Sequence, residues 1–78
     1  MSHTPHELAE EFPAAVDRMH ALKATDPHFA RLADEYHEVN RAVHRAETRV
    51  DTISDEAESA LRHKRAHLKD EIARILAA

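Results

Sequence analysis

The sequence predicts an all-α protein: a short N-terminal helix followed by an antiparallel, coiled-coil-like helical hairpin that self-associates into a bundle. The 78 residues include no glycine and only three prolines, so nearly every position suits a helix. From residue 29 to residue 50, apolar side chains recur in alternating steps of three and four. This is the 3.5-residue repeat of a coiled-coil seam. We therefore expect one domain, residues 1–78, with helices at about 5–24, 27–50 and 55–76.

The first predicted helix, residues 5–24, begins beside Thr4 and Pro5, because threonine can cap a helix and proline suits its first turn. Apolar residues then recur at helical spacing as far as Leu22. Pro13 interrupts this pattern, since proline lacks the N–H that a helix interior needs and disfavours helical dihedral angles in the preceding residue. We expect a kink or a break at Pro13.

The second predicted helix, residues 27–50, carries the regular seam. Asp26 can accept hydrogen bonds from the first free amides, and Pro27 is well tolerated at the first helical position. The apolar side chains of the seam are Phe29, Leu32, Tyr36, Val39, Val43, Ala46 and Val50. A seam that spans roughly 36 Å, at 1.5 Å per residue, requires a partner helix.

The third predicted helix, residues 55–76, supplies that partner. Thr52 or Ser54 can cap it, and acidic residues in its first turn are favoured by the helix dipole. Because the joint between the two long helices is short, they are expected to lie antiparallel. The predicted packing and interface residues are Phe29, Leu32, Tyr36, Val39, Val43, Leu61, Leu68, Ile72 and Ile75.

One polar residue, Asn40, interrupts the apolar face of the second helix. In a hairpin centred near Thr52, Asn40 lies near the level of Lys64. Such a polar pair lowers stability but can fix register and the number of partners. We therefore expect Asn40→Leu to raise the melting temperature and to broaden the distribution of oligomers.

Several motifs along the chain point to a known family. In chain order they are Phe12-Pro13, Leu22-Lys23, Asp26-Pro27-His28-Phe29 with Leu32, Val39 and Val43, and Leu68-Lys69-Asp70-Glu71-Ile72. Together they resemble the YdcH-like family of small bacterial helical-hairpin proteins of unknown function, over about residues 12–76. Members of that family often carry histidine where this chain has Tyr36 and aspartate where it has Asn40. The resemblance implies a hairpin fold and supplies no activity.

Composition narrows the classes of function. Eleven Lys and Arg against fifteen Asp and Glu give a net charge of −4, which argues against nucleic acid and anionic membranes as partners. Without cysteine the chain has no disulfide, thiolate metal site or thiol nucleophile. The apolar runs are too short for a signal peptide or a membrane span, so we expect a cytoplasmic protein. Without a glycine-rich phosphate loop or an activated serine, we expect neither an enzyme nor a cofactor.

The eight histidines are the most unusual feature of the composition. His63 and His67 lie four residues apart on one helical face, a spacing that can bind Zn or Ni, and His37 would lie level with His67. The simpler interpretation is that these histidines are exposed and flank the seam, and we expect no metal site. Histidines near a helical interface could instead make association sensitive to pH between pH 5 and 7.

Two basic stripes follow the predicted hairpin: Arg41, Arg45 and Arg49 on the second helix, and Arg62, Arg65 and Lys69 on the third. Such stripes can bind phosphates or nucleic acid. Nearby acidic residues offset them, however, and no aromatic side chain alternates with them to stack on bases. The sequence therefore favours solvated helix faces over a nucleic-acid surface.

A chain of this size gains little stability from a single core, and a lone hairpin leaves apolar stripes uncovered. We therefore expect a homo-oligomer, with a dimer that completes a four-helix bundle as the first choice and a tetramer as the second. The favoured function is that of a structural or adaptor protein that acts by binding itself or another protein. The alternative is a small regulator that binds a metal ion through its histidines or nucleic acid through its arginines.

Overall fold

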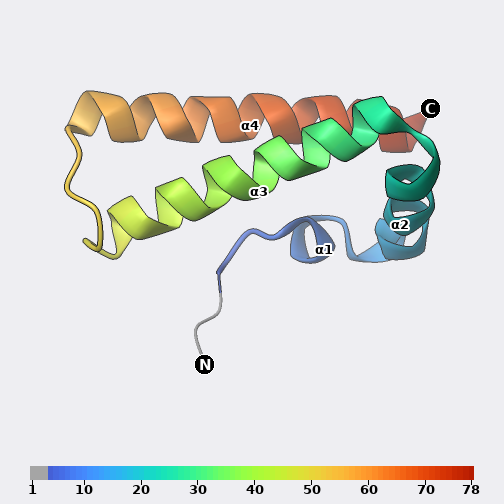
Figure 1. Ribbon diagram of the computed structural model, residues 1–78, viewed down its shortest axis with the longest axis horizontal. Helices are drawn as coiled ribbons and strands as arrows, with labels where there is room; N and C mark the ends of the chain where they lie inside the picture. The colour runs from blue at the N-terminus through green and yellow to red at the C-terminus, as the bar shows by residue number, and fades with distance from the viewer. Residues whose placement is uncertain (1–3) are drawn as a thin grey trace.

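A helical hairpin forms the frame of the molecule in the computed structural model, which describes residues 4–78 (Figure 1). Helix α3 spans Pro27–Glu47, and helix α4 spans Asp55–Ala77. The chain reverses between them, and the two helices lie side by side (Figure 1). The prediction of an all-α fold is confirmed, because the described residues form helices and no strand.

Both hairpin helices begin at side-chain caps. The carboxylate of Asp26 accepts hydrogen bonds from the backbone amides of His28 at 3.0 Å and Phe29 at 3.3 Å. The hydroxyl of Ser54 accepts a hydrogen bond from the amide of Ala57 at 3.1 Å. Each cap satisfies amides that have no partner inside the helix, which explains why the two helices start where the sequence predicts.

Helix α3 ends at Glu47, short of its predicted end at Val50. The amide of Arg49 donates to the carbonyl of Ala46 at 3.2 Å, and the amide of Val50 donates to the carbonyl of Arg45 at 2.9 Å. These two bonds form a Schellman motif around Arg49, whose φ is +65°. Because the chain leaves the helix here, Val50 does not continue the seam, and 71% of its surface is exposed.

Arg49→Gly is expected to raise the free energy of unfolding by about 1 kcal/mol, because glycine adopts the left-handed conformation without the steric cost of a Cβ atom. Chemical denaturation measures this change. Arg49→Ala is the matched control, since it removes the same charge but keeps the Cβ atom. An equal gain in both variants would attribute the effect to the lost charge instead of the backbone.

The N-terminal part consists of short pieces instead of one helix over residues 5–24. Helix α1 spans Leu8–Glu11, the 3-10 helix η1 spans Pro13–Ala15, and helix α2 spans Val16–Thr25. Phe12, which precedes the proline, has φ −131° and ψ 63°, outside the helical region. The interruption that the sequence predicts at this proline is therefore a break.

Thr4 and Pro5 do not begin a helix, contrary to the prediction. Glu7 is the N-cap residue of α1, and it forms no side-chain cap hydrogen bond. His6 has a φ of +63°, which is incompatible with a right-handed helix. The carbonyl groups of Pro5 and His6 accept hydrogen bonds from α3 instead. Tertiary contacts have thus replaced the predicted first helical turn.

Arg18 fixes α2 to the end of the hairpin that lies far from the loop. Its guanidinium donates hydrogen bonds to the carbonyl groups of Leu76 and, at 2.8 Å, of Ala78. These carbonyl groups belong to the C-terminal end of α4, where the helix dipole favours positive charge. As Figure 1 shows, α2 therefore lies beside the start of α3 and the end of α4, opposite the loop of the hairpin.

The core lies where α1 and α2 pack on the hairpin. Its buried residues are Leu8, Met19, Phe29, Leu32, Ala33, Tyr36, Val39, Val43, Leu68 and Ile72. Two further predicted packing residues, Leu61 and Ile75, are partly buried against this cluster. The seam of α3 thus faces the core as far as Ala46, which is also buried.

Candidate association surface

The N-terminal segment, residues 4–11, is bound to α3 by two buried polar side chains. The hydroxyl of Tyr36 donates to the carbonyl oxygen of His6 at 2.6 Å, and the Asn40 amide donates to the carbonyl oxygen of Pro5 at 2.9 Å. Burial raises the pKa of Tyr36 to about 12, with a smaller contribution from the negative charge of Glu11. The Tyr36 hydroxyl therefore stays protonated at neutral pH and remains a donor.

Asn40 also connects the N-terminal segment to α4. Its carbonyl oxygen Oδ1 accepts a hydrogen bond from Arg65 Nη1 at 2.9 Å, while its side chain is 0% exposed. The sequence places Asn40 opposite Lys64 in the hairpin. Its partner in α4 is Arg65, the next residue, so the predicted alignment of the two helices at Asn40 is correct. The buried side-chain amide of Asn40 therefore has hydrogen-bond partners on both sides: its NH2 group donates to Pro5, and its oxygen accepts from Arg65.

Ion pairs hold the same segment from outside. Glu7 Oε2 lies 2.7 Å from His37 Nδ1, and Lys69 Nζ donates to Glu11 Oε1 at 2.9 Å. The hydrogen bond from Lys69 lowers the pKa of Glu11. Residues 4–11 are therefore tied to both α3 and α4 along the middle of the hairpin.

The other half of the hairpin carries no such cover. We call residues 41–61 the loop half; Figure 1 shows α1 and α2 packed away from it. Val50 and Ile53 are 71% and 37% exposed, and they are the exposed large apolar residues of the described chain. The loop half is thus two helices thick and ends in an apolar tip.

An open groove runs from the middle of the hairpin onto its loop half. Its apolar residues are Val39, Ala42 and Leu61, and its polar residues are Glu38, Arg41 and Arg45. Arg45 Nε lies 2.9 Å from Asp51 Oδ2, so one side chain of the groove also contacts the loop. Glu38 and Arg41 form no ion pair with another residue of the described chain. An apolar floor with unpaired charges of both signs can accept another helix of mixed charge.

The three histidines that the sequence offers as metal ligands do not form a site. His37 pairs with Glu7, and His67 Nε2 lies 3.0 Å from Glu71 Oε1 within α4. His63 is exposed on the surface of α4. Within residues 4–78, no group of three or more His, Cys, Asp or Glu residues is placed to hold a metal ion.

The basic stripes are largely engaged inside the molecule. Arg45 pairs with Asp51, Arg62 with Glu47 and Glu58, Arg65 with Asn40, and Lys69 with Glu11. A cation that already neutralises a carboxylate releases little free energy when it binds a phosphate. No specific contact therefore favours the alternative of a nucleic-acid-binding regulator.

Sequence reasoning missed the anchoring of the N-terminal segment and the apolar tip. Tyr36 and Asn40 lie four residues apart on the buried face of α3. Two polar side chains at such positions signal that a backbone segment lies opposite them, because buried donors need acceptors. The exposure of Val50 had no comparable signal, since a Schellman motif around a non-glycine residue has no strong sequence pattern.

A search for membrane-spanning helices and comparisons with known proteins complete the description of this surface. Among residues 4–78, no helix is long and apolar enough to cross a membrane. A family model described as a protein of unknown function (DUF465) matches residues 29–76, which cover nearly all of α3, the loop and nearly all of α4. No curated protein and no solved structure matches the chain.

Proposed function

We propose that this chain, which belongs to the DUF465 family of proteins of unknown function, acts as a structural or adaptor protein by binding a second copy of itself through the loop half of its hairpin. The family is consistent with the YdcH-like resemblance of the motifs. The family match covers most of the hairpin and leaves out α1 and α2, and it names no function, so the proposal rests on the structure of this chain.

One observation carries the proposal: the N-terminal helices cover one half of the hairpin and leave the other half uncovered (Figure 1). Val50 and Ile53 are the exposed large apolar residues of the described chain, and both belong to this uncovered half. Complete burial of a fully exposed side chain of this size is worth about 1.5–3 kcal/mol, and Val50 and Ile53 can gain the part of it that matches their exposed surface. A dimer would bury two copies of each.

Charge favours a second copy as the occupant of the groove. Glu38 and Arg41 flank the groove without an ion pair in the described chain. A two-fold axis through the groove would set Glu38 of each copy against Arg41 of the other, because an isologous interface uses the same patch twice. Two antiparallel hairpins packed in this way form a four-helix bundle.

Ala42→Glu tests this function. A carboxylate on the groove floor would be buried without a partner in the dimer, so the measured mass should fall from twice 8.9 kDa to 8.9 kDa. Light scattering after size-exclusion chromatography, across a concentration series, measures this mass. Ala24→Glu is the matched control, because Ala24 is exposed near the end of α2.

Two results would overturn the proposal. If the natural chain keeps a mass of 8.9 kDa up to high micromolar concentration, it does not associate with itself. If Ala42→Glu and Ala24→Glu leave the same oligomer, the groove is not the interface. Circular dichroism of both variants confirms that neither substitution acts by unfolding the helices.

A further inference from the structure

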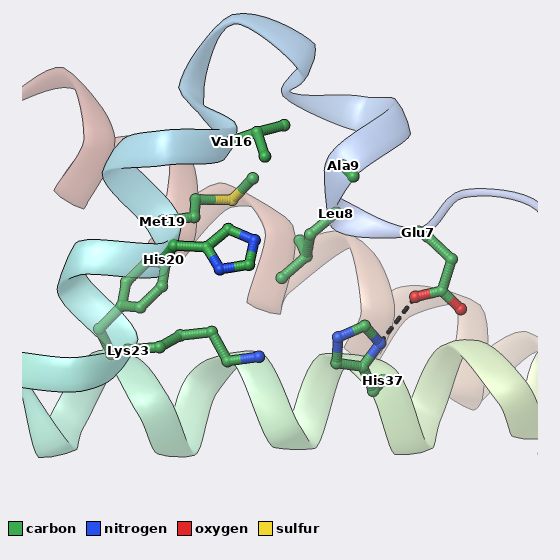
Figure 2. A pocket seen from close by; sticks show the side chains of 9 residues that line it. Glu7, Leu8, Ala9, Val16, Met19, His20, Lys23 and His37 are labelled. Atoms are coloured by element: carbon green, nitrogen blue, oxygen red, sulfur yellow. Dashed lines mark ion pairs between the residues drawn. The ribbon is translucent and has the colours of Figure 1, made fainter.

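A small apolar cavity lies on the side of the hairpin that the N-terminal helices cover (Figure 2). Its volume is about 150 Å³. Leu8 of α1 contributes to its wall, Val16 and Met19 of α2 continue it, and Phe29 of α3 completes it. The cavity thus forms where three helices meet, and its wall is mainly hydrocarbon.

Polar side chains surround the mouth of this cavity. His20 and Lys23 project from α2, and the Lys23 ammonium extends across the mouth toward His37 of α3 (Figure 2). Glu7 Oε2 already pairs with His37 at 2.7 Å. Within residues 4–78, neither the His20 side chain nor the Lys23 side chain forms a hydrogen bond or an ion pair. One ammonium group is therefore available above an apolar space.

We propose that this cavity binds a small amphipathic monocarboxylate, an aromatic or branched acid whose apolar body is about the size of benzene. An apolar cavity of about 150 Å³ can hold benzene. The hydrocarbon body would contact Leu8, Met19 and Phe29, while the carboxylate would accept a charge-assisted hydrogen bond from Lys23 and a second one from the His20 ring.

The charges at the mouth select a monoanion over a phosphate dianion. Glu7 Oε2 already lies against His37, and Lys23, the one Lys or Arg side chain at the mouth, has no carboxylate partner in the described chain. A dianion would place its second charge near the Glu7 carboxylate, where like charges repel. This site is separate from the loop half of the hairpin, so its occupancy does not depend on self-association.

Benzoate is the probe for this site, with benzyl alcohol and acetate as the two partial ligands. Benzyl alcohol has the apolar body without the charge, and acetate has the charge without the body. Benzoate should shift the NMR resonances of Leu8 and Met19 and bind at least about tenfold more tightly than either partial ligand. Benzoate that shifts no cavity resonance at millimolar concentration would overturn the proposal.

Two lysine variants separate the charge from the cavity. Lys23→Met keeps most of the side-chain length and should weaken benzoate binding about tenfold while leaving benzyl alcohol binding unchanged. Lys64→Met is the matched control, because Lys64 is exposed on α4 and does not line the cavity. Equal benzoate affinity in the two variants would show that Lys23 does not hold the carboxylate.

Val16→Phe tests the cavity by filling it. The larger ring should occupy the space between α1 and α2 and abolish the binding of benzoate and of benzyl alcohol together. If benzoate still binds to this variant with the affinity of the natural chain, the ligand lies outside the cavity, and the proposal fails. The melting temperature of each variant shows whether the fold is retained.

Discussion

Phe29→Ala is expected to lower the free energy of unfolding by about 3–5 kcal/mol, the usual cost of removing a buried phenylalanine ring. The Phe29 side chain is 0% exposed and belongs to the core at the start of α3. A chain of this size has a total stability of about 4–12 kcal/mol. The variant should therefore melt about 15–30 °C lower than the natural chain, as measured by circular dichroism.

Val50→Ala is the control, because the sequence pattern and the structure predict different effects for this substitution. The three-four repeat assigns Phe29 and Val50 to the same seam. In the structure, 71% of Val50 is exposed beyond the end of α3. We expect Val50→Ala to change the free energy of unfolding by less than about 0.5 kcal/mol at low protein concentration. Comparable losses in the two variants would mean that α3 continues to residue 50.

Asn40→Leu is expected to lower the free energy of unfolding by about 2–4 kcal/mol, the reverse of the rise that the seam position alone predicts. Leucine would leave the Pro5 carbonyl oxygen and the Arg65 guanidinium without the partners that they have at 2.9 Å. Each lost partner costs about 1–3 kcal/mol at a buried site. Urea denaturation measures the loss.

A double-mutant cycle with Arg65→Met assigns the cause of this loss. If the contact between Asn40 and Arg65 carries part of it, the double variant should lose less stability than the sum of the single variants. Amide exchange should also become faster in α1, because Asn40 holds the segment that precedes it. A higher melting temperature for Asn40→Leu would contradict this prediction. It would support the view that Asn40 fixes the register of the hairpin at a cost in stability.

The features that the sequence predicted correctly depend on residues close together in the chain. The caps at Asp26 and Ser54 need donors two or three residues away, and the break at Pro13 needs only the ring and its neighbour. The buried face of α3 from Phe29 to Ala46 follows from helical periodicity. Local physical chemistry determines such features, because each of them depends on residues only a few positions apart.

The features that the sequence predicted wrongly depend on residues far apart in the chain. The start of the first helix moved from Pro5 to Leu8 because Tyr36 and Asn40 bind the carbonyl groups of His6 and Pro5, about thirty positions earlier. The sequence likewise gives no sign that His37, which it offers as a candidate metal ligand, lies against Glu7. Periodicity shows that a side chain faces inward, but it does not show which group lies opposite. Only the packing of the N-terminal segment on the hairpin decided those partners, because each buried donor takes the acceptor that the tertiary fold brings to it.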